Sequence, residues 1–363
     1  MGDLLLNKAE NKIKINSKIK NYEVFFENSF DKILKKIPTN SVLIVDQNLR
    51  KKLEKKIKKK NFKTLYIKAS EKSKSFEKIG DTIKQLIQIS VNKTSTIVAI
   101  GGGTIQDLVA FISSIFFRGI DWIFIPTTLL SQCDSCIGGK TSINFHGIKN
   151  QLGNFYPPNK IFINFNFLKD ISNRDLKSGL GEMSHFYFVS GNKDFLIFDG
   201  YLKKAINRNL DVIQKIIKRS LSIKKIFIEK DEFDKKERII LNYGHSFGHA
   251  IEKITKFKIP HGIAVANGMN IANFVSFKMK YIGKNQFNKM NSTLDRLLGK
   301  DKLKKFKIDE LIKALKKDKK NLKGSLRLIL TKGLGKMFIK KIDDHSKIRD
   351  ILIDYQNTLQ KSK

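Results

Sequence analysis

The sequence predicts two domains, an α/β domain with a parallel sheet followed by a mainly α-helical domain. In the first half, short runs rich in β-branched and aromatic residues alternate with segments of helical periodicity, as in parallel α/β domains. From about Lys169 onward the apolar residues instead follow helical spacing. The chain has 363 residues and is 41% hydrophobic, which is enough for two substantial cores. The predicted domains are residues 1–168 and 169–363.

Six strands are expected in the first domain. They lie at residues 22–26, 42–46, 64–68, 96–100, 122–125 and 161–165. In the second domain the apolar residues between Leu202 and Leu221 follow a helical pattern, and residues 325–330 and 336–342 predict a pair of strands. The sequence shows no internal repeat. No linker rich in Pro, Gly or Ser separates the two halves.

The formal charge of +37 is consistent with nucleic acid, an anionic membrane or phosphorylated substrates as partners. The lysines are scattered along the whole chain. The most basic run, residues 51–60, is interleaved with Leu53 and Ile57 and predicts the solvated face of a helix. A nucleic-acid-binding protein would need a clustered basic face with interleaved aromatic residues. We therefore attribute most of the charge to overall composition and predict no nucleic-acid partner.

The two cysteines, Cys133 and Cys136, form a single CxxC pair with no second pair to complete a zinc site, and we interpret them as incidental. Without a disulfide framework, a reducing cytoplasm is expected. The longest apolar run, residues 108–117, stops at Arg118, and the N-terminus lacks the apolar core of a signal peptide. No membrane association is predicted.

A glycine turn follows the expected strand at residues 96–100. Gly101, Gly102 and Gly103 come directly before a segment that predicts the start of a helix. Such a turn lets backbone amides approach a phosphate at the helix N-terminus, but it also occurs simply as a tight turn. Other stretches leave the same two interpretations open. They are Thr127–Thr128, which follow a strand, and the lysine-containing glycine turns at 138–140 and 147–150.

Three of the six histidines, His245, His249 and His261, fall within residues 242–261. On a helix, His245 and His249 would lie on one face, about 6 Å apart along the axis. Pro260 is expected to end this helix, so that His261 approaches from a different segment. An isolated pair would be more consistent with packing histidines. The third histidine favours a metal site, to which a carboxylate from elsewhere would be added, because a catalytic zinc has three protein ligands and an open position.

Together these motifs resemble those of the 3-dehydroquinate synthases. These are sugar phosphate cyclases that share their fold with glycerol dehydrogenase and iron-type alcohol dehydrogenases. The resemblance extends from about residue 46 to residue 327 and rests on GGGTIQD, FFRG, IPTTLL, DSCIGGKTSIN, GIKNQLG, SGLGEM, NYGHSFGHAIE and PHGIAVANGM. It implies a Rossmann-like NAD-binding domain followed by a mainly helical metal-binding domain, and a homodimer.

The resemblance also implies which residues form the site. The metal, Zn²⁺ or Co²⁺, would be bound by Glu182, His245 and His261, and His249 would line the site as a candidate proton carrier. The residues implied for NAD are Asp46, Glu71, Lys74, Gly101, Gly102, Gly103, Asp107, Thr127, Thr128, Lys140, Lys149, Phe167, Lys169 and Asp170. Those implied for the substrate are Asp134, Lys140, Lys224, Arg238, Asn242, Asn150, Lys320 and Arg118, of which Arg118 would reach across the homodimer.

Three positions depart from the family pattern. Gln106 replaces a glycine, which is expected to tighten the phosphate turn, and Asp170 replaces a threonine, which puts one cofactor contact in doubt. The third is His185, where the family has a lysine in the substrate pocket. This change implies either weaker phosphate binding or a related cyclase with another sugar phosphate.

The activity implied is the conversion of 3-deoxy-D-arabino-heptulosonate 7-phosphate, a phosphorylated keto acid sugar, into 3-dehydroquinate and phosphate in the shikimate pathway of aromatic amino acid biosynthesis. NAD would remove a hydride and return it in each turnover, so the enzyme would be a carbon–oxygen lyase in outcome. The alternative is a related sugar phosphate cyclase acting on another heptulose phosphate in a secondary pathway. The presence of Lys224, Arg238 and His249 favours the carboxylated substrate. If the segment from Arg238 to His245 is helical, Arg238, Asn242 and His245 are expected to lie near one face and to point into the metal site together.

Overall fold

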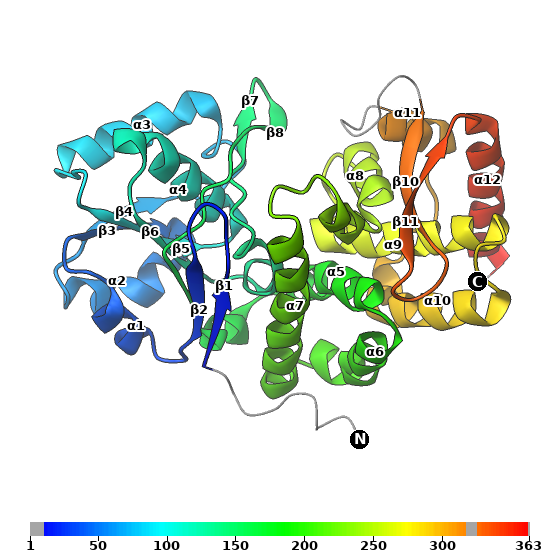
Figure 1. Ribbon diagram of the computed structural model, residues 1–363, viewed down its shortest axis with the longest axis horizontal. Coiled ribbons are helices and arrows are strands. Elements are labelled where there is room, and N and C mark those ends of the chain that lie inside the picture. Colours follow the sequence, from blue (N-terminus) through cyan, green and yellow to red (C-terminus); the bar gives the residue numbers. More distant parts are fainter. Residues whose placement is uncertain (1–10, 317–324, 362–363) are drawn as a thin grey trace. The chain divides into compact units, whose positions relative to one another are not determined.

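The computed structural model describes residues 11–316 and 325–361, and the chain divides into two compact units (Figure 1). The first unit runs to Ile171 and also includes Lys224–Phe233. The second consists of Ser172–Ile223 and the chain from Asp234 onward. The predicted boundary at residues 168 and 169 lies three positions before the observed junction, and the sequence analysis did not anticipate the return of Lys224–Phe233 to the first unit.

The first unit is built on a seven-stranded sheet in the order β1-β2-β9-β6-β5-β3-β4. All neighbouring strands pair in parallel except β1 and β2, which are antiparallel. The strands are β1 (Lys12–Ile15), β2 (Tyr22–Phe26), β3 (Ser41–Asp46), β4 (Lys63–Ile67), β5 (Thr96–Gly101), β6 (Trp122–Pro126) and β9 (Lys160–Ile163). The predicted parallel α/β fold is confirmed, and β1 is an edge strand that was not predicted.

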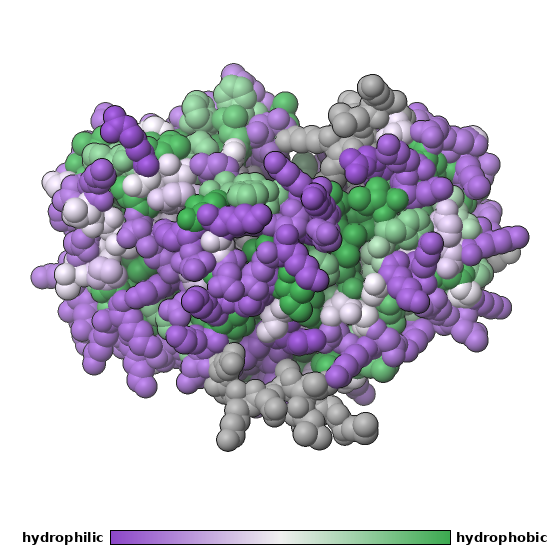
Figure 2. All heavy atoms as spheres, viewed as in Figure 1, coloured by the Kyte–Doolittle hydropathy of each residue, from purple (hydrophilic) through white to green (hydrophobic). Residues whose placement is uncertain are grey.

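Helices cover both faces of this sheet (Figure 1). They are α1 (Phe30–Lys36), α2 (Arg50–Lys58), α3 (Phe76–Gln88) and α4 (Gly103–Ile115). Leu34 of α1 and Leu53 of α2 belong to one buried cluster with Val45, Val98 and Ile125 from the sheet. On the face in Figure 2, hydrophilic residues are spread over the whole of the first unit.

Short elements complete the first unit. They are η2 (Gln47–Leu49), η3 (Phe116–Arg118), a π-helical turn η4 (Ser131–Ser135), the hairpin β7 (Ile143–Phe145) and β8 (Ile148–Leu152), and η5 (Phe165–Asp170). The predicted strand at residues 161–165 ends at Ile163, because Phe165 already belongs to η5.

The second unit is mainly helical, as predicted. Its helices are α5 (Asn173–Ser190), α6 (Asn192–Ile206), α7 (Leu210–Lys230, which belongs to this unit up to Ile223), η6 (Glu237–Asn242), α8 (His245–Ile254), α9 (His261–Lys278), α10 (Lys284–Leu298), η7 (Gly299–Asp301), α11 (Ile308–Lys316) and α12 (His345–Lys361). The predicted strand pair is confirmed as β10 (Leu326–Thr331) and β11 (Met337–Ile342), which are antiparallel. Helix α9 packs against α5, α8, α10 and α12, and every residue from Gly262 to Ser276 is buried.

Among the residues that the structure describes, no helix is long and apolar enough to span a membrane.

Candidate active site

Three helices of the second unit approach one another at glycines. A Cβ atom added to Gly262 in the first turn of α9 would lie 1.8 Å from the carbonyl oxygen of Ser178 on α5. A Cβ atom added to Gly268 of α9 would lie 2.1 Å from the carbonyl oxygen of Gly244, which precedes α8. Backbones can approach this closely only where no side chain intervenes. These contacts bring together the polar residues that α5, α8 and α9 carry.

Glu182 on α5 lies between His245 at the start of α8 and His261 at the start of α9. Its Oε1 is 3.3 Å from Nε2 of His245, and its Oε2 is 3.3 Å from Nε2 of His261. On the other side of each ring, Nδ1 of His245 faces the carbonyl oxygen of Tyr243 at 3.4 Å, and Nδ1 of His261 lies 3.1 Å from Oε2 of Glu252. Both histidines thus present Nε2 to one carboxylate while an outer oxygen orients Nδ1, as metal-binding histidines do.

The charge state of Glu182 is unusual for a side chain that is 3% exposed. Burial acts to raise the pKa of its carboxyl, yet the positive charges of His261 and His245, together with the hydrogen bond from His245, hold the pKa well below its usual range. Its buried Oε2 accepts no hydrogen bond within the described chain. A buried anion of this kind is stable only beside cationic partners.

The donor spacing fits a metal ion. Donors about 2.0–2.1 Å from one tetrahedral zinc lie roughly 3.3–3.4 Å apart, which matches both contacts of Glu182. Within the described residues, two groups of possible ligands have donor atoms within 4.8 Å of one another, Glu182 with His185 and His245, and His249 with Glu252 and His261. His261 therefore falls in the second group, although its Nε2 faces Glu182. Carboxylate and imidazole donors in this number suit Zn²⁺ or Co²⁺.

The sequence analysis missed Glu252, although the residue lies inside the histidine-rich stretch. It is three positions after His249 on α8, so both point from one face, and its carboxylate reaches His261. This spacing was the signal that could have identified it. The expected i,i+4 arrangement of His245 and His249 is present, with ring centroids 5.6 Å apart.

Two details of the predicted geometry were wrong. Pro260 does not end the histidine helix, which stops at Ile254; it is the N-cap of the next helix, α9. Arg238 and Asn242 also do not share a helix with His245. They lie in η6, and Gly244, with φ of +84°, breaks the chain before α8 begins. Arg238 is buried, and the side-chain amide of Asn242 donates a hydrogen bond to the carbonyl oxygen of Ile239.

In the first unit, the glycine turn has the expected form. Gly101 ends β5, Gly102 is the N-cap of α4 and Gly103 is its first residue. A Cβ atom on Gly102 would lie 2.9 Å from Cγ2 of Thr128, so the turn approaches the threonine segment closely. Thr127 is buried, and its backbone N–H donates to the carbonyl oxygen of Gly101.

The side chain of Gln106, the substitution close to this turn, bonds to Ser135. Its amide donates a 2.6 Å hydrogen bond to the carbonyl oxygen of Ser135, and its Oε1 accepts one of the same length from the Ser135 hydroxyl. The side chain that replaces the family glycine is therefore accommodated by a reciprocal pair with η4.

Five residues implied for NAD and substrate binding form one polar network near this turn. The ammonium of Lys74 contacts Oδ2 of Asp107 at 2.8 Å and Oδ1 of Asn150 at 3.0 Å. Glu71 pairs with Lys149 at 3.2 Å. Asn144, which the sequence analysis did not single out, joins the two halves by donating to Glu71 and accepting from the backbone N–H of Asn150.

Asp107 is the most perturbed member of this network. Burial raises the pKa of its carboxyl to about 6, against the opposing charge and hydrogen bond of Lys74. Its side chain is nevertheless 22% exposed, which leaves it accessible to a ligand.

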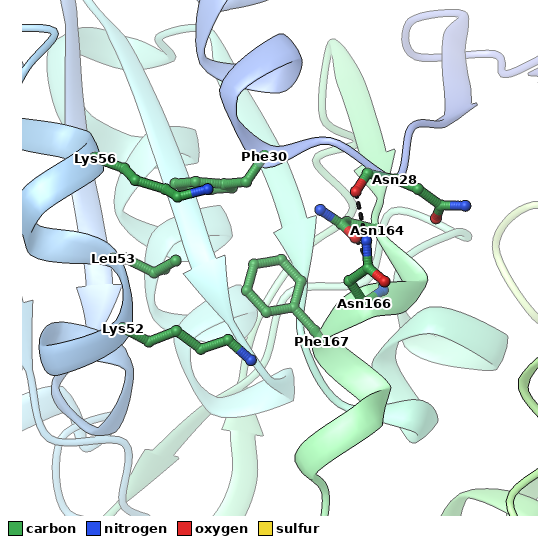
Figure 3. Close-up of a pocket in the computed structure, with 8 residues that line it drawn as sticks. All are labelled: Asn28, Phe30, Lys52, Leu53, Lys56, Asn164, Asn166 and Phe167. Carbon is green, nitrogen blue, oxygen red and sulfur yellow. Dashed lines mark hydrogen bonds between the residues drawn. The ribbon is translucent and has the colours of Figure 1, made fainter.

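The remaining residues implied for NAD lie apart from that network. Asp46 ends β3 and accepts a hydrogen bond from the backbone N–H of Asn48. Phe167 is buried against a small cavity of about 150 Å³ that is lined also by Lys52 (Figure 3). Lys169 and Asp170 are exposed at the end of η5, where Asp170 pairs with Lys52 at 2.6 Å.

Two of the residues implied for the substrate are already paired. Nζ of Lys224 lies 2.7 Å from Oδ1 of Asp134 and 2.7 Å from the carbonyl oxygen of the same residue. Lys224 is 7% exposed, so its ammonium is held in one position. Lys140 follows two glycines in the left-handed region, Gly138 and Gly139, and is exposed. The predicted Lys320 lies outside the described residues.

Comparison with known proteins identifies the family. The family model for the 3-dehydroquinate synthase N-terminal domain matches residues 64–178, and that for the C-terminal domain matches residues 179–321. The chain belongs to the 3-dehydroquinate synthase family. It is therefore an enzyme of that family, as the sequence motifs predicted.

The relatives extend over most of the chain. The 3-dehydroquinate synthase of Dictyoglomus thermophilum is 39% identical over 276 residues, which cover 76% of this chain and 78% of the relative. The structure of 2-deoxy-scyllo-inosose synthase, complexed with carbaglucose-6-phosphate, NAD⁺ and Co²⁺, has a TM-score of 0.86 at 23% identity and covers 94% of this chain and 99% of its own. The structure of 2-epi-5-epi-valiolone synthase from Streptomyces hygroscopicus, with NAD⁺ and Zn²⁺, has a TM-score of 0.84 at 20% identity and covers 97% and 99%. These two structures share the fold.

Proposed function

We propose that this chain is a 3-dehydroquinate synthase. It converts 3-deoxy-D-arabino-heptulosonate 7-phosphate into 3-dehydroquinate and phosphate in the shikimate pathway. The observation that carries the proposal is the pair of Nε2 atoms, from His245 and His261, that face the buried carboxylate of Glu182 at 3.3 Å. Relatives that bear this name are up to 39% identical, whereas the fold neighbours with other cyclase activities are 20–23% identical.

Glu182, His245 and His261 hold the metal in this proposal, and zinc suits their nitrogen and oxygen donors. The metal supplies Lewis-acid polarisation of a substrate hydroxyl. Glu252 fixes the tautomer of His261, because a proton on Nδ1 is shared with the carboxylate at 3.1 Å and Nε2 keeps its lone pair. The carbonyl oxygen of Tyr243 does the same for His245.

The first unit binds NAD in this proposal. The glycine turn before α4 and the segment from Thr127 let backbone amides approach the pyrophosphate, and the network around Lys74 borders this turn. The cofactor supplies a hydride acceptor that is restored within each turnover. The enzyme is consequently a carbon–oxygen lyase that acts on a phosphate ester and needs NAD only in catalytic amount.

The charged residues bind the anionic groups of the substrate. Lys224, held by Asp134, is a fixed point charge, and Arg238 offers a planar fork that suits the carboxylate. Lys140 adds an exposed cation, Asn242 an amide, and His249 a ring that can carry a proton. Arg238 is only 4% exposed, so a substrate carboxylate that pairs with its guanidinium is shielded from water, where a charge-assisted hydrogen bond is strong.

One observation favours a second candidate, a cyclase that acts on another heptulose phosphate. The family lysine in the substrate pocket is His185 here, which removes a permanent positive charge. The buried Arg238 weighs against this candidate, because its planar guanidinium suits a carboxylate, which such a substrate lacks.

We propose that the chain acts as a cytoplasmic homodimer. Arg118, the residue implied to reach the partner, is exposed beside Phe117, whose side chain is 43% exposed. Both have positive φ values, +64° and +50°, which a non-glycine residue adopts only at a cost. An exposed apolar ring on such a segment suits contact with a second copy.

The experiment that tests the proposed function measures phosphate release from two substrates. Purified protein with NAD and zinc is incubated with the heptulosonate phosphate or with a seven-carbon sugar phosphate that lacks the carboxylate. The proposal expects rapid phosphate release and a dehydroquinate product from the first. Faster cyclisation of the second would replace the proposed function with the second candidate.

A further inference from the structure

His185 lies on the same face of α5 as Glu182. The two residues are three positions apart on one helix, so their side chains are neighbours, and both are 3% exposed at the side chain. A Glu-x-x-His pair on one helix is a known source of two ligands to a single metal centre, as in the carboxylate-bridged di-iron bundles. The sequence therefore places a second potential ligand on the helix that already carries Glu182.

The distances bring His185 within reach of an ion bound by Glu182 and His245. Nδ1 of His185 lies 3.9 Å from Oε1 of Glu182. Two donors about 2.1 Å from one ion can be at most about 4.2 Å apart, so this pair can share it. Ligand atoms of His185, Glu182 and His245 all lie within 4.8 Å of one another, and the rings of His185 and His245 are 5.1 Å apart in a T-shaped arrangement.

We propose that His185 is a fourth protein ligand of the metal ion, through Nδ1, in addition to Glu182, His245 and His261. The inference rests on the proposed metal centre and assigns His185 a different role from that of the lysine it replaces. A protonated lysine has three donors and no acceptor, so it binds substrate anions and cannot ligate a metal. A neutral histidine carries no positive charge to bind an anion, but its ring nitrogen can ligate a metal.

This role has two consequences. An additional nitrogen ligand would bind the metal more tightly than three ligands would, and catalytic zinc can expand to five-coordinate, so a substrate oxygen could still bind. The second unit also lacks the fixed charge of the family lysine, so its binding of substrate anions depends more on Arg238.

The test uses Co²⁺ as the probe, because the position and intensity of its d–d absorption depend on the number and type of its ligands. Full-length protein is stripped of metal, loaded with one equivalent of Co²⁺, and titrated with a competing chelator. His185→Ala removes the ring, His185→Gln retains much of its volume, and His185→Lys restores the family residue. His146→Ala, an exposed histidine in the first unit, is the matched control. Circular dichroism of the metal-free proteins verifies that each variant is folded.

The inference expects all three His185 variants to bind Co²⁺ roughly tenfold or more weakly than the parent and to show a changed Co²⁺ spectrum, with His146→Ala unchanged. It is overturned if folded His185→Ala and His185→Gln keep the affinity and spectrum of the parent. The two hypotheses fail separately. If the parent releases phosphate from the heptulosonate but the His185 variants leave the Co²⁺ spectrum unchanged, the proposed function stands and the proposed role of His185 is wrong. If the Co²⁺ spectrum depends on His185 but the parent does not turn over the heptulosonate, the role of His185 stands and the proposed function is wrong.

Discussion

Nε2 of His261, at the start of α9, lies 3.3 Å from the buried Oε2 of Glu182, in the middle of α5. Because this oxygen accepts no hydrogen bond within the described chain, its main stabilisation without metal is the charge of the facing imidazoles. A divalent cation between the same atoms would satisfy the carboxylate fully. The close approach of α5 and α9 at glycine therefore brings Glu182 and His261 to the distance that the proposed metal site requires.

The first prediction concerns metal binding. His261→Ala should lose most of its zinc, because one of the proposed protein ligands is removed, and activity should fall with it. Metal analysis of the purified variant, after dialysis against a weak chelator, measures this. A full complement of tightly bound zinc in His261→Ala would contradict the assignment. Glu252→Gln gives an intermediate case: loss of the charged outer partner should weaken metal binding by about 10–100-fold.

Gly262 should be intolerant of any side chain. In Gly262→Ala the new methyl would meet the carbonyl oxygen of Ser178 at 1.8 Å, so α5 and α9 must separate, at a cost of about 3 kcal/mol in unfolding free energy. Gly200→Ala, in the interior of α6 with nothing within 4 Å, is the control and should be stabilising by about 0.5–1 kcal/mol. Urea unfolding of both variants measures the difference, and equal effects would refute the close approach.

Asp107 should make stability depend on pH. Its pKa of about 6 in the folded protein lies above its unfolded value, so the protonated form favours folding. That stabilisation is complete below about pH 4, the unfolded pKa, and is lost as pH rises through 6. Relative to Asp107→Asn, the parent should lose about 1–3 kcal/mol between pH 4 and pH 7. Urea unfolding of both proteins across this range measures the loss.

The exposed Asp81→Asn serves as the control for that series, since its side chain is 63% exposed. A constant difference between the parent and Asp107→Asn at all pH values would show that Asp107 ionises in the fold as it does in the unfolded chain.

Arg238→Leu tests recognition of the carboxylate. Removing one partner of a buried ion pair costs about 2–5 kcal/mol, so kcat/KM on the heptulosonate phosphate should fall roughly 30-fold to several-thousand-fold. On the substrate without the carboxylate, kcat/KM should fall much less, so the variant should prefer the carboxylated substrate less strongly than the parent does. If kcat/KM falls equally for both substrates, Arg238 has a structural role and does not bind the substrate carboxylate.

The fold was largely predictable because its local patterns agree with its packing. The predicted strands β3, β5 and β6 are short apolar runs that are buried on both faces, and the glycine turn before α4 follows directly from β5. Packing between distant segments was not predictable. The return of Lys224–Phe233 to the first unit brings Lys224 to Asp134, and no local pattern around Lys224 indicates it.

The candidate site was predictable to a similar degree. The histidine spacing identified α8, and the family resemblance supplied Glu182. Glu252 was overlooked because its role depends on where α9 begins. The shared face expected for Arg238, Asn242 and His245 fails because Gly244 adopts a left-handed conformation that ends one helix before the next begins.

The account is tested most directly by following the hydride during turnover. Protein with zinc, the heptulosonate phosphate and a trace of NAD is monitored for phosphate and for absorbance of NADH. The account predicts many equivalents of phosphate and dehydroquinate for each NAD, with no net accumulation of NADH. If NADH accumulates in step with product, the enzyme is a dehydrogenase and the proposed cyclisation is wrong.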